Sequence, residues 1–209
     1  MIVAFGRELG AGGRAVGERV ARILGVELLD KQIVDLVAAR LGAPTAYVEA
    51  RDEQVEGFVE RLFRVITSAY PEAYVGDNVP DWPEERLAQL TAQIIQEQAQ
   101  TQSLVVIGRG APILLRNRPD VCRVLVVASM ETRARRLSER LAFSYEDAMR
   151  QLRQSDQHRT AYMHQHYQVD WRNAHLYDVV VNTDRLDYDA AAQVVVEASR
   201  RLGLAQAPA

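Results

Sequence analysis

The chain has 209 residues, of which 48% are hydrophobic and 25% charged, and its formal net charge is −3 at pH 7. These values are ordinary for a single globular domain and argue against a general nucleic-acid-binding surface. One cysteine, Cys122, excludes an intramolecular disulfide and a cysteine-rich zinc site. No stretch is long and apolar enough to span a membrane, and no basic leader precedes the first apolar run, so we expect a cytoplasmic protein.

The N-terminal segment predicts a strand, a glycine-rich turn and a helix. Residues 2–5 form an apolar run typical of a buried strand, and apolar residues recur at helical spacing from Val16 to Leu24. Glycines in the turn at 6–14 allow backbone N–H groups to approach a ligand, and the N-terminus of the helix favours an anion. The turn is therefore either a phosphate site or a tight connection without a ligand.

This turn departs from a Walker A loop. Gly13 stands where the lysine of such a loop is expected, and neither Arg14 nor Ala15 carries the hydroxyl that would bind Mg²⁺. The only lysine of the chain is Lys31, so a cation at a phosphate site has to be an arginine. We hypothesise that Arg7 or Arg14 supplies the missing positive charge.

The next segments predict a second strand and a helical block. Residues 26–29 form a short apolar run that ends at Asp30, where a carboxylate is either a ligand group at the edge of a parallel sheet or a helix N-cap, and both roles are compatible. Residues 43–100 read as helical with one break at 71–82. This block is either an inserted substrate-binding lobe or a packing layer over the sheet, with a role in homodimer formation.

The second half of the chain continues the alternation of strands and helices. Residues 104–107 and 121–128 predict strands, and Ser129 is expected to cap a helix on which three arginines share one face, namely Arg133, Arg136 and Arg140. That face is either a solvated basic surface or, because it begins at the same sheet edge as the glycine turn, part of the phosphate site.

Residues 142–175 are polar and rich in arginine and histidine, and the histidines have no acidic or cysteine partner at ligand spacing, so no metal site is predicted. Arginines on a mobile segment above a phosphate site would neutralise charge that develops during phosphoryl transfer. Residues 177–181 predict the last strand, and 188–202 the last helix. The expected fold is α/β, with a five-stranded, mostly parallel sheet and helices on both faces.

In order and spacing these segments resemble the cytidylate kinase-like family, which is related to the P-loop nucleoside monophosphate kinases. The resemblance covers most of the chain and rests on five motifs, at residues 7–14, 29–31, 106–111, 133–136 and 181–184. It implies one P-loop kinase-like domain over residues 1–209, a three-layer sandwich with 43–100 as an acceptor-side lobe and about 142–175 as a lid.

The resemblance also implies transfer of the ATP γ-phosphoryl group to a (d)CMP-like acceptor, with Mg²⁺ as cofactor. The implied donor-binding residues are Gly10, Ala11, Gly12, Gly13, Arg14, Ala15, Arg133 and Arg136. The resemblance further implies that Arg109 binds the acceptor and that Arg153 and Arg159 are catalytic. From their positions in the sequence, Arg7 and Asp30 are added as acceptor-binding candidates and Arg14 as a catalytic candidate. Gly110 departs from the family aspartate after Arg109. Together with Gly13 and Ala15, this leaves two alternatives open: a catalytically impaired nucleotide- or phosphate-binding regulatory protein, and a kinase for another small molecule.

Overall fold

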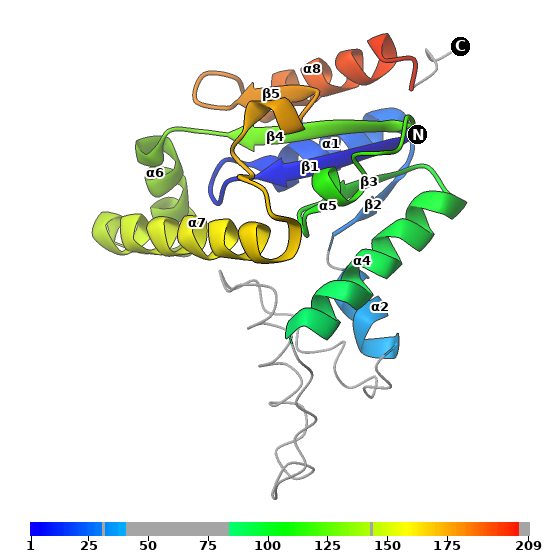
Figure 1. The fold of residues 1–209 in the computed structure, drawn as a ribbon. Helices are drawn as coiled ribbons and strands as arrows, with labels where there is room; N and C mark the ends of the chain where they lie inside the picture. The colour runs from blue at the N-terminus through cyan, green and yellow to red at the C-terminus, as the bar shows by residue number, and fades with distance from the viewer. Residues whose placement is uncertain (31, 41–83, 143, 205–209) are drawn as a thin grey trace, which may run out of the picture. The chain divides into compact units, whose positions relative to one another are not determined.

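The computed structural model describes residues 1–30, 32–40, 84–142 and 144–204 (Figure 1). The chain divides into two compact units, one formed by residues 1–30 with 96–209 and the other by residues 31–95. Most of the helical block predicted at 43–100 lies outside the described residues, as does its break at 71–82. Helix α4 (Glu84–Thr101) is the described part of this block, and helix α2 (Gln32–Arg40) precedes the block in the chain.

The sheet has five strands in the order β2-β3-β1-β4-β5, and every pairing is parallel. The strands are β1 (Ile2–Arg7), β2 (Glu27–Leu29), β3 (Leu104–Ile107), β4 (Val121–Val127) and β5 (Val179–Asn182). The predicted α/β fold with a five-stranded, mostly parallel sheet is confirmed, and the sheet is parallel throughout. Parallel pairing places all strand carboxyl ends at one edge, which is where ligands bind in open α/β sheets.

Helices cover both faces of this sheet (Figure 1). The remaining elements in chain order are α1 (Gly13–Leu24), α5 (Ala111–Leu114), α6 (Met130–Leu141), α7 (Tyr145–Tyr167), the 3₁₀ helix η2 (Ala174–Leu176) and α8 (Tyr188–Arg201). Helices α1 and α8 pack on one face of the sheet (Figure 1). Helix α5 lies on the opposite face, and α7, which packs against α6, lies on that side as well.

Side chains of β4 point alternately to the two faces of the sheet and so belong to two hydrophobic clusters. Cys122, Val124 and Val126 belong to the core cluster that includes residues of α1 and α8, whereas Leu125 belongs to the cluster that includes Met163 of α7. Successive side chains of a strand point to opposite faces, so a strand buried on both sides must be apolar at every position. The apolar runs of β1 and β3 have this structural cause, whereas Arg123, a half-buried position of β4, is polar and pairs with Asp178.

Several element boundaries differ from the prediction for identifiable reasons. Strand β1 continues two residues further, because Gly6 and Arg7 pair with β4. Strand β5 begins only at Val179, because the N–H of Tyr177 donates to the carbonyl of Ala174 (3.1 Å) and closes the 3₁₀ turn. The polar segment after α6 is a helix of 23 residues, capped by Ser144, whose hydroxyl accepts from the N–H of Asp147.

Candidate functional site

The backbone between β1 and α1 forms an open cradle of N–H groups. Gly10 and Gly12 have φ values of 80° and 79°, in the left-handed region that glycine adopts without strain. No backbone carbonyl in the described part of the chain accepts a hydrogen bond from the N–H groups of Gly10, Gly12 or Gly13. The dipole of α1 adds positive potential at the same point, so the cradle is suited to bind an anion.

Neighbouring protein groups lie so close to the three cradle glycines that these positions have no room for a side chain. A Cβ on Gly10 would lie 2.9 Å from the carbonyl oxygen of Arg133, and a Cβ on Gly12 would overlap the ring of Tyr188. A Cβ on Gly13 would lie 2.6 Å from the Cβ of Arg7. The loop is thus held in one conformation by its neighbours.

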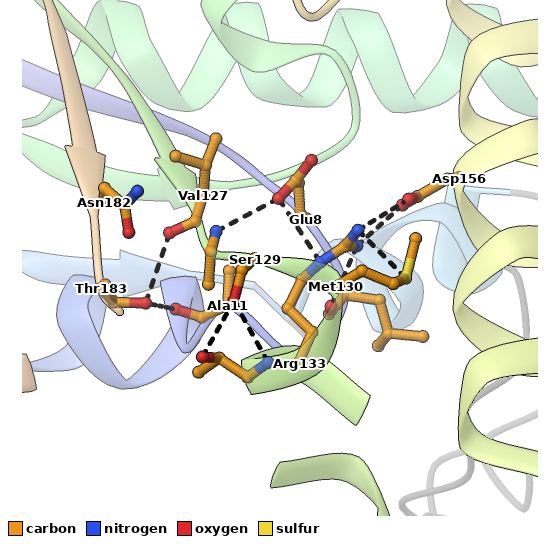
Figure 2. A network of polar contacts seen from close by, with 12 residues as sticks. Glu8, Ala11, Val127, Ser129, Met130, Arg133, Asp156, Asn182 and Thr183 are labelled. Atoms are coloured by element: carbon orange, nitrogen blue, oxygen red, sulfur yellow. Dashed lines mark hydrogen bonds and ion pairs between the residues drawn. The ribbon is translucent and has the colours of Figure 1, made fainter. Parts of the chain in front are cut away.

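A buried ionic network supports the cradle from the side of α6 and α7 (Figure 2). Arg133, only 3% exposed, donates from Nη1 and Nη2 to the two carboxylate oxygens of Asp156 at 3.1 and 3.0 Å. Its Nε lies 3.5 Å from the carboxylate of Glu8, which in turn accepts from the N–H of Ala128 at 3.2 Å. Arg172 donates to Asp156 at 2.7 Å. The network therefore ties α7 to the residues that follow β1 and β4.

Arg136 supports the cradle from the end of β5. Its guanidinium donates to the hydroxyl and the carbonyl of Thr183 at 3.0 and 2.6 Å, and the hydroxyl of Thr183 donates to the carbonyl of Ala11 at 2.8 Å. The same guanidinium lies 5.3 Å from the ring centroid of Tyr188, within the range of a cation–π contact. Arg133 and Arg136, two of the three arginines predicted to bind the donor nucleotide, are thus linked to the cradle by contacts with other protein groups.

Arg159, one helical turn after Asp156, has a different environment. Its guanidinium lies 5.3 Å from the ring of Trp171, and its Nε is buried without a hydrogen-bond partner among the described residues. Burial, followed by the positive charge of Arg7, lowers the pKa of Arg159 to about 10. The carboxylates of Asp156 and Glu8 raise this pKa in part. A buried N–H without an acceptor is costly for the fold, and an anionic ligand that accepted from Nε would remove that cost.

The turn after β3 has unusual backbone geometry. Gly108, Arg109 and Gly110 have φ values of 78°, 59° and 70°, and such values are strained for a residue with a side chain, as at Arg109. A Cβ on Gly110 would lie 2.7 Å from the ring of Tyr167, so this tyrosine takes the space of the missing aspartate side chain. Strain of this kind is concentrated at functional sites.

The remaining predicted residues lie in varied surroundings. Arg14 and Asp30 meet at the carboxyl edge of β2, with Nε and Oδ2 3.4 Å apart, and the Arg14 Nε also donates to Glu18 at 2.9 Å. Arg153 is exposed on α7. Ala15 lies in the first turn of α1 and has no side-chain oxygen.

Sequence reasoning missed the residues that organise the site: Glu8, Asp156, Trp171, Tyr167 and Tyr188. Glu8 offered a signal, because an acidic residue directly after a buried strand lies at a ligand edge. Asp156 offered a weaker signal, as an acidic residue in a segment rich in arginine. The aromatic residues offered none, since nothing in their spacing indicates which glycine each ring covers.

The donor groups fit phosphate oxygens, but they do not provide a protein-held metal site. The open amides and the Arg159 guanidinium are hydrogen-bond donors to anions. Within the described ranges, no group of three or more His, Cys, Asp or Glu residues is placed to hold a metal ion. In the same part of the chain, no helix is long and apolar enough to cross a bilayer.

The fold and the glycine turn define an α/β protein of the P-loop kinase type. A shikimate kinase from Bacteroides thetaiotaomicron is similar in fold, with a TM-score of 0.53, 16% identity and coverage of 97% of both chains. An uncharacterised protein from Eubacterium ventriosum has a TM-score of 0.70 at 19% identity, covering 96% of this chain and 98% of that one.

The sequence model of the cytidylate kinase-like family matches residues 2–185, and the chain belongs to this family. A cytidylate kinase from Pyrobaculum neutrophilum is 28% identical over 203 residues, covering 94% of this chain and 91% of the relative. The resemblance stated from the motifs is thereby confirmed.

Proposed function

We propose that the protein is a nucleotide phosphotransferase that moves the γ-phosphoryl group of ATP to a (d)CMP-like nucleoside monophosphate. Two observations carry this proposal: the open amides of the cradle, and Arg159, whose Nε is buried and lacks a hydrogen-bond partner in the described part of the chain. Arg7 links them, because its side chain lies beside Gly13 and because burial and, after it, the positive charge of Arg7 lower the pKa of Arg159. Family membership and the kinase fold point to the same chemistry. The cytidylate kinase name of the relatives suggests the acceptor.

In the proposed reaction an oxygen of the acceptor phosphate attacks the γ-phosphorus of ATP, and the bond between that phosphorus and the β–γ bridging oxygen breaks. The products are a nucleoside diphosphate and ADP. The acceptor oxygen is already ionised, so the protein contributes position and positive charge more than proton transfer. The cradle at Gly10–Gly13 orients the donor phosphates, and Arg159 neutralises charge on the transferring group.

The acceptor is proposed to bind near the carboxyl ends of β2 and β3, where Asp30 and the strained Arg109 lie. Mg²⁺ accompanies ATP in kinases of this type, and the described residues offer it no dedicated cage. The metal is therefore proposed to enter with the nucleotide, held chiefly by its phosphates and by water.

Calorimetry with ATP, CMP, dCMP, UMP and AMP, followed by a coupled ADP-release assay with the tightest acceptor, tests this proposal. We expect micromolar to millimolar binding of ATP and a preference for a cytidine monophosphate, with ADP release that depends on the acceptor. Absence of ATP binding, or ADP release that no acceptor accelerates, would contradict the proposal.

A second function, nucleotide binding without turnover, is favoured by one observation: position 13 lacks a lysine and position 15 lacks a hydroxyl. ATP binding with no ADP release from any acceptor would support it. A small-molecule acceptor is the third alternative, and shikimate and gluconate belong in the assay as arms that distinguish it. Homodimer formation and a cytoplasmic location stay predictions, and light scattering after gel filtration checks the first.

A further inference from the structure

The side chain of Arg7 fills the space beside position 13 of the cradle. A Cβ on Gly13 would lie 2.6 Å from the Cβ and 3.1 Å from the Cδ of Arg7. Arg7 is the last residue of β1 and pairs with Val126 of β4, so its main chain cannot move aside without breaking the sheet. Any larger side chain at position 13 would therefore compete with the stem of Arg7 for one volume.

The guanidinium of Arg7 ends at a second glycine, in the turn after β3. A Cβ on Gly108 would contact Nη1 of Arg7 directly and would lie 3.5 Å from its Cζ. Gly108 also has a left-handed backbone, so a side chain there would be strained as well. Glycines from two separate loops thus leave the space that the Arg7 side chain occupies.

A second observation concerns another arginine near Arg7, Arg159. The positive charge of Arg7 acts on Arg159, whose buried Nε has no acceptor in the described ranges and whose ring partner is Trp171. Two cations near one another repel, and a multiply charged phosphate that both contact would be attracted to each of them.

Resting on the proposed function, we propose that Arg7 is the phosphate-binding cation of the cradle, in the role that a lysine at position 13 has in a Walker A loop. Arg7 and Arg159, from β1 and α7, would hold the phosphoryl oxygens of the donor triphosphate from two sides. Gly13 and Gly108 are small because the Arg7 side chain needs their space.

An exchange of the cation between the two positions tests this inference. The proteins are the wild type, Arg7→Met, Arg7→Lys, Gly13→Lys and the double variant Arg7→Ala/Gly13→Lys, with Arg22→Ala as control. Arg22 is exposed near the C-terminal end of α1, away from the cradle. Calorimetry with ATP, tripolyphosphate and adenosine measures the affinities, and thermal melts establish folding.

We expect Arg7→Met, which keeps most of the stem volume, to weaken ATP and tripolyphosphate binding roughly 10- to 100-fold without affecting adenosine. Arg7→Lys keeps the charge and should retain more affinity than Arg7→Met. Gly13→Lys alone should be impaired because both side chains need one space, and the double variant should recover affinity relative to Arg7→Met. Arg22→Ala should match the wild type.

Equal tripolyphosphate affinity in the wild type and in folded Arg7→Met would overturn the inference and leave the proposed function standing. If the double variant binds ATP no better than Arg7→Met, a lysine at position 13 cannot replace Arg7, and this result would also count against the inference. If the wild type binds neither ATP nor tripolyphosphate, the inference and the proposed function both fail, which separates the two kinds of failure.

Discussion

Arg133 on α6 and Arg159 on α7 both bury a guanidinium Nε, yet their surroundings differ. Arg133 donates to both carboxylate oxygens of Asp156 and lies 3.5 Å from Glu8. Arg159 has the ring of Trp171 and no acceptor for its Nε within the described part of the chain. A buried charge is costly unless it is paired, so we infer that Arg133 supports the fold whereas Arg159 awaits an anion.

The difference shows that residue type alone does not distinguish the two roles. Both arginines come from segments that the sequence assigns to nucleotide binding. The two arginines differ in their hydrogen-bond partners: the carboxylate of Asp156 on α7 accepts from the guanidinium of Arg133 on α6 (Figure 2). Substitutions that change only one of the two environments sharpen the comparison.

The largest effect is expected from Arg159→Ala. Loss of an arginine that neutralises the transferring phosphoryl group lowers kcat by roughly 10³-fold, as in other phosphoryl transferases. Stability should change little, because the variant removes an unfavourable desolvated charge together with a cation–π contact worth about 1 kcal/mol. The coupled ADP-release assay and a thermal melt check this. Arg150→Ala, an exposed arginine of the same helix, is the matched control, and unchanged turnover in Arg159→Ala would contradict the assignment.

In contrast to Arg159→Ala, the main effect of Asp156→Ala is expected on stability. It should lower the free energy of unfolding by about 3–5 kcal/mol, because Arg133 stays buried without its main partner. Denaturant unfolding measures the change, with Gln157→Ala, the exposed neighbour on α7, as control. If the folded fraction of Asp156→Ala were as stable as the wild type, the paired environment would not be a structural support.

The thermal stabilisation that a phosphate ligand produces is a third way to distinguish Arg133 from Arg159. Tripolyphosphate at about 100 times its Kd should stabilise the wild type by about 2.7 kcal/mol and raise its Tm. Arg159→Ala should lose most of this shift at the same concentration, whereas Arg150→Ala should keep it. An equal shift in all three proteins would mean that Arg159 does not contact the phosphates.

Arg172→Gln should have a smaller effect, because the Arg172 side chain is 46% exposed and solvent screens its ion pair with Asp156. We expect a loss of at most about 1 kcal/mol in unfolding free energy and no change in ATP affinity. Denaturant unfolding and calorimetry check both. A loss as large as that of Asp156→Ala would show that Arg172, and not Arg133, is the main partner of that carboxylate.

The smallest effect is a pH dependence away from the cradle. Hydrogen bonds from Arg123 hold the pKa of Asp178 below its ordinary value of 3.8, so this pair stabilises the fold above about pH 4 and the contribution is lost as the pH falls through the folded-state pKa. Asp178→Asn should lower the Tm at pH 7 by a few degrees and flatten its decline below pH 4. Melts from pH 2 to 7 check this, and an unchanged acid limb would contradict it.

Much of the fold could be predicted from local patterns. The apolar runs at β1, β3 and β4 indicate strands buried on two faces, and Gly25 and Ser129 cap α1 and α6 as expected. Such signals are visible in the sequence because each depends on neighbours along the chain. Ile23, by contrast, fits the helical spacing of α1 but is 40% exposed, since the width of the apolar stripe depends on what covers it.

The glycine turn, the parallel α/β order and the family follow from the amino-acid sequence, because backbone freedom and apolar periodicity are local properties. The partners of the arginines do not. Asp156 meets Arg133, Tyr188 covers Gly12, and Arg7 lies in the space beside Gly13 only after strands and helices distant along the chain have packed. Charge pairing and steric exclusion act through space, so the partners of each arginine are decided only in the assembled fold.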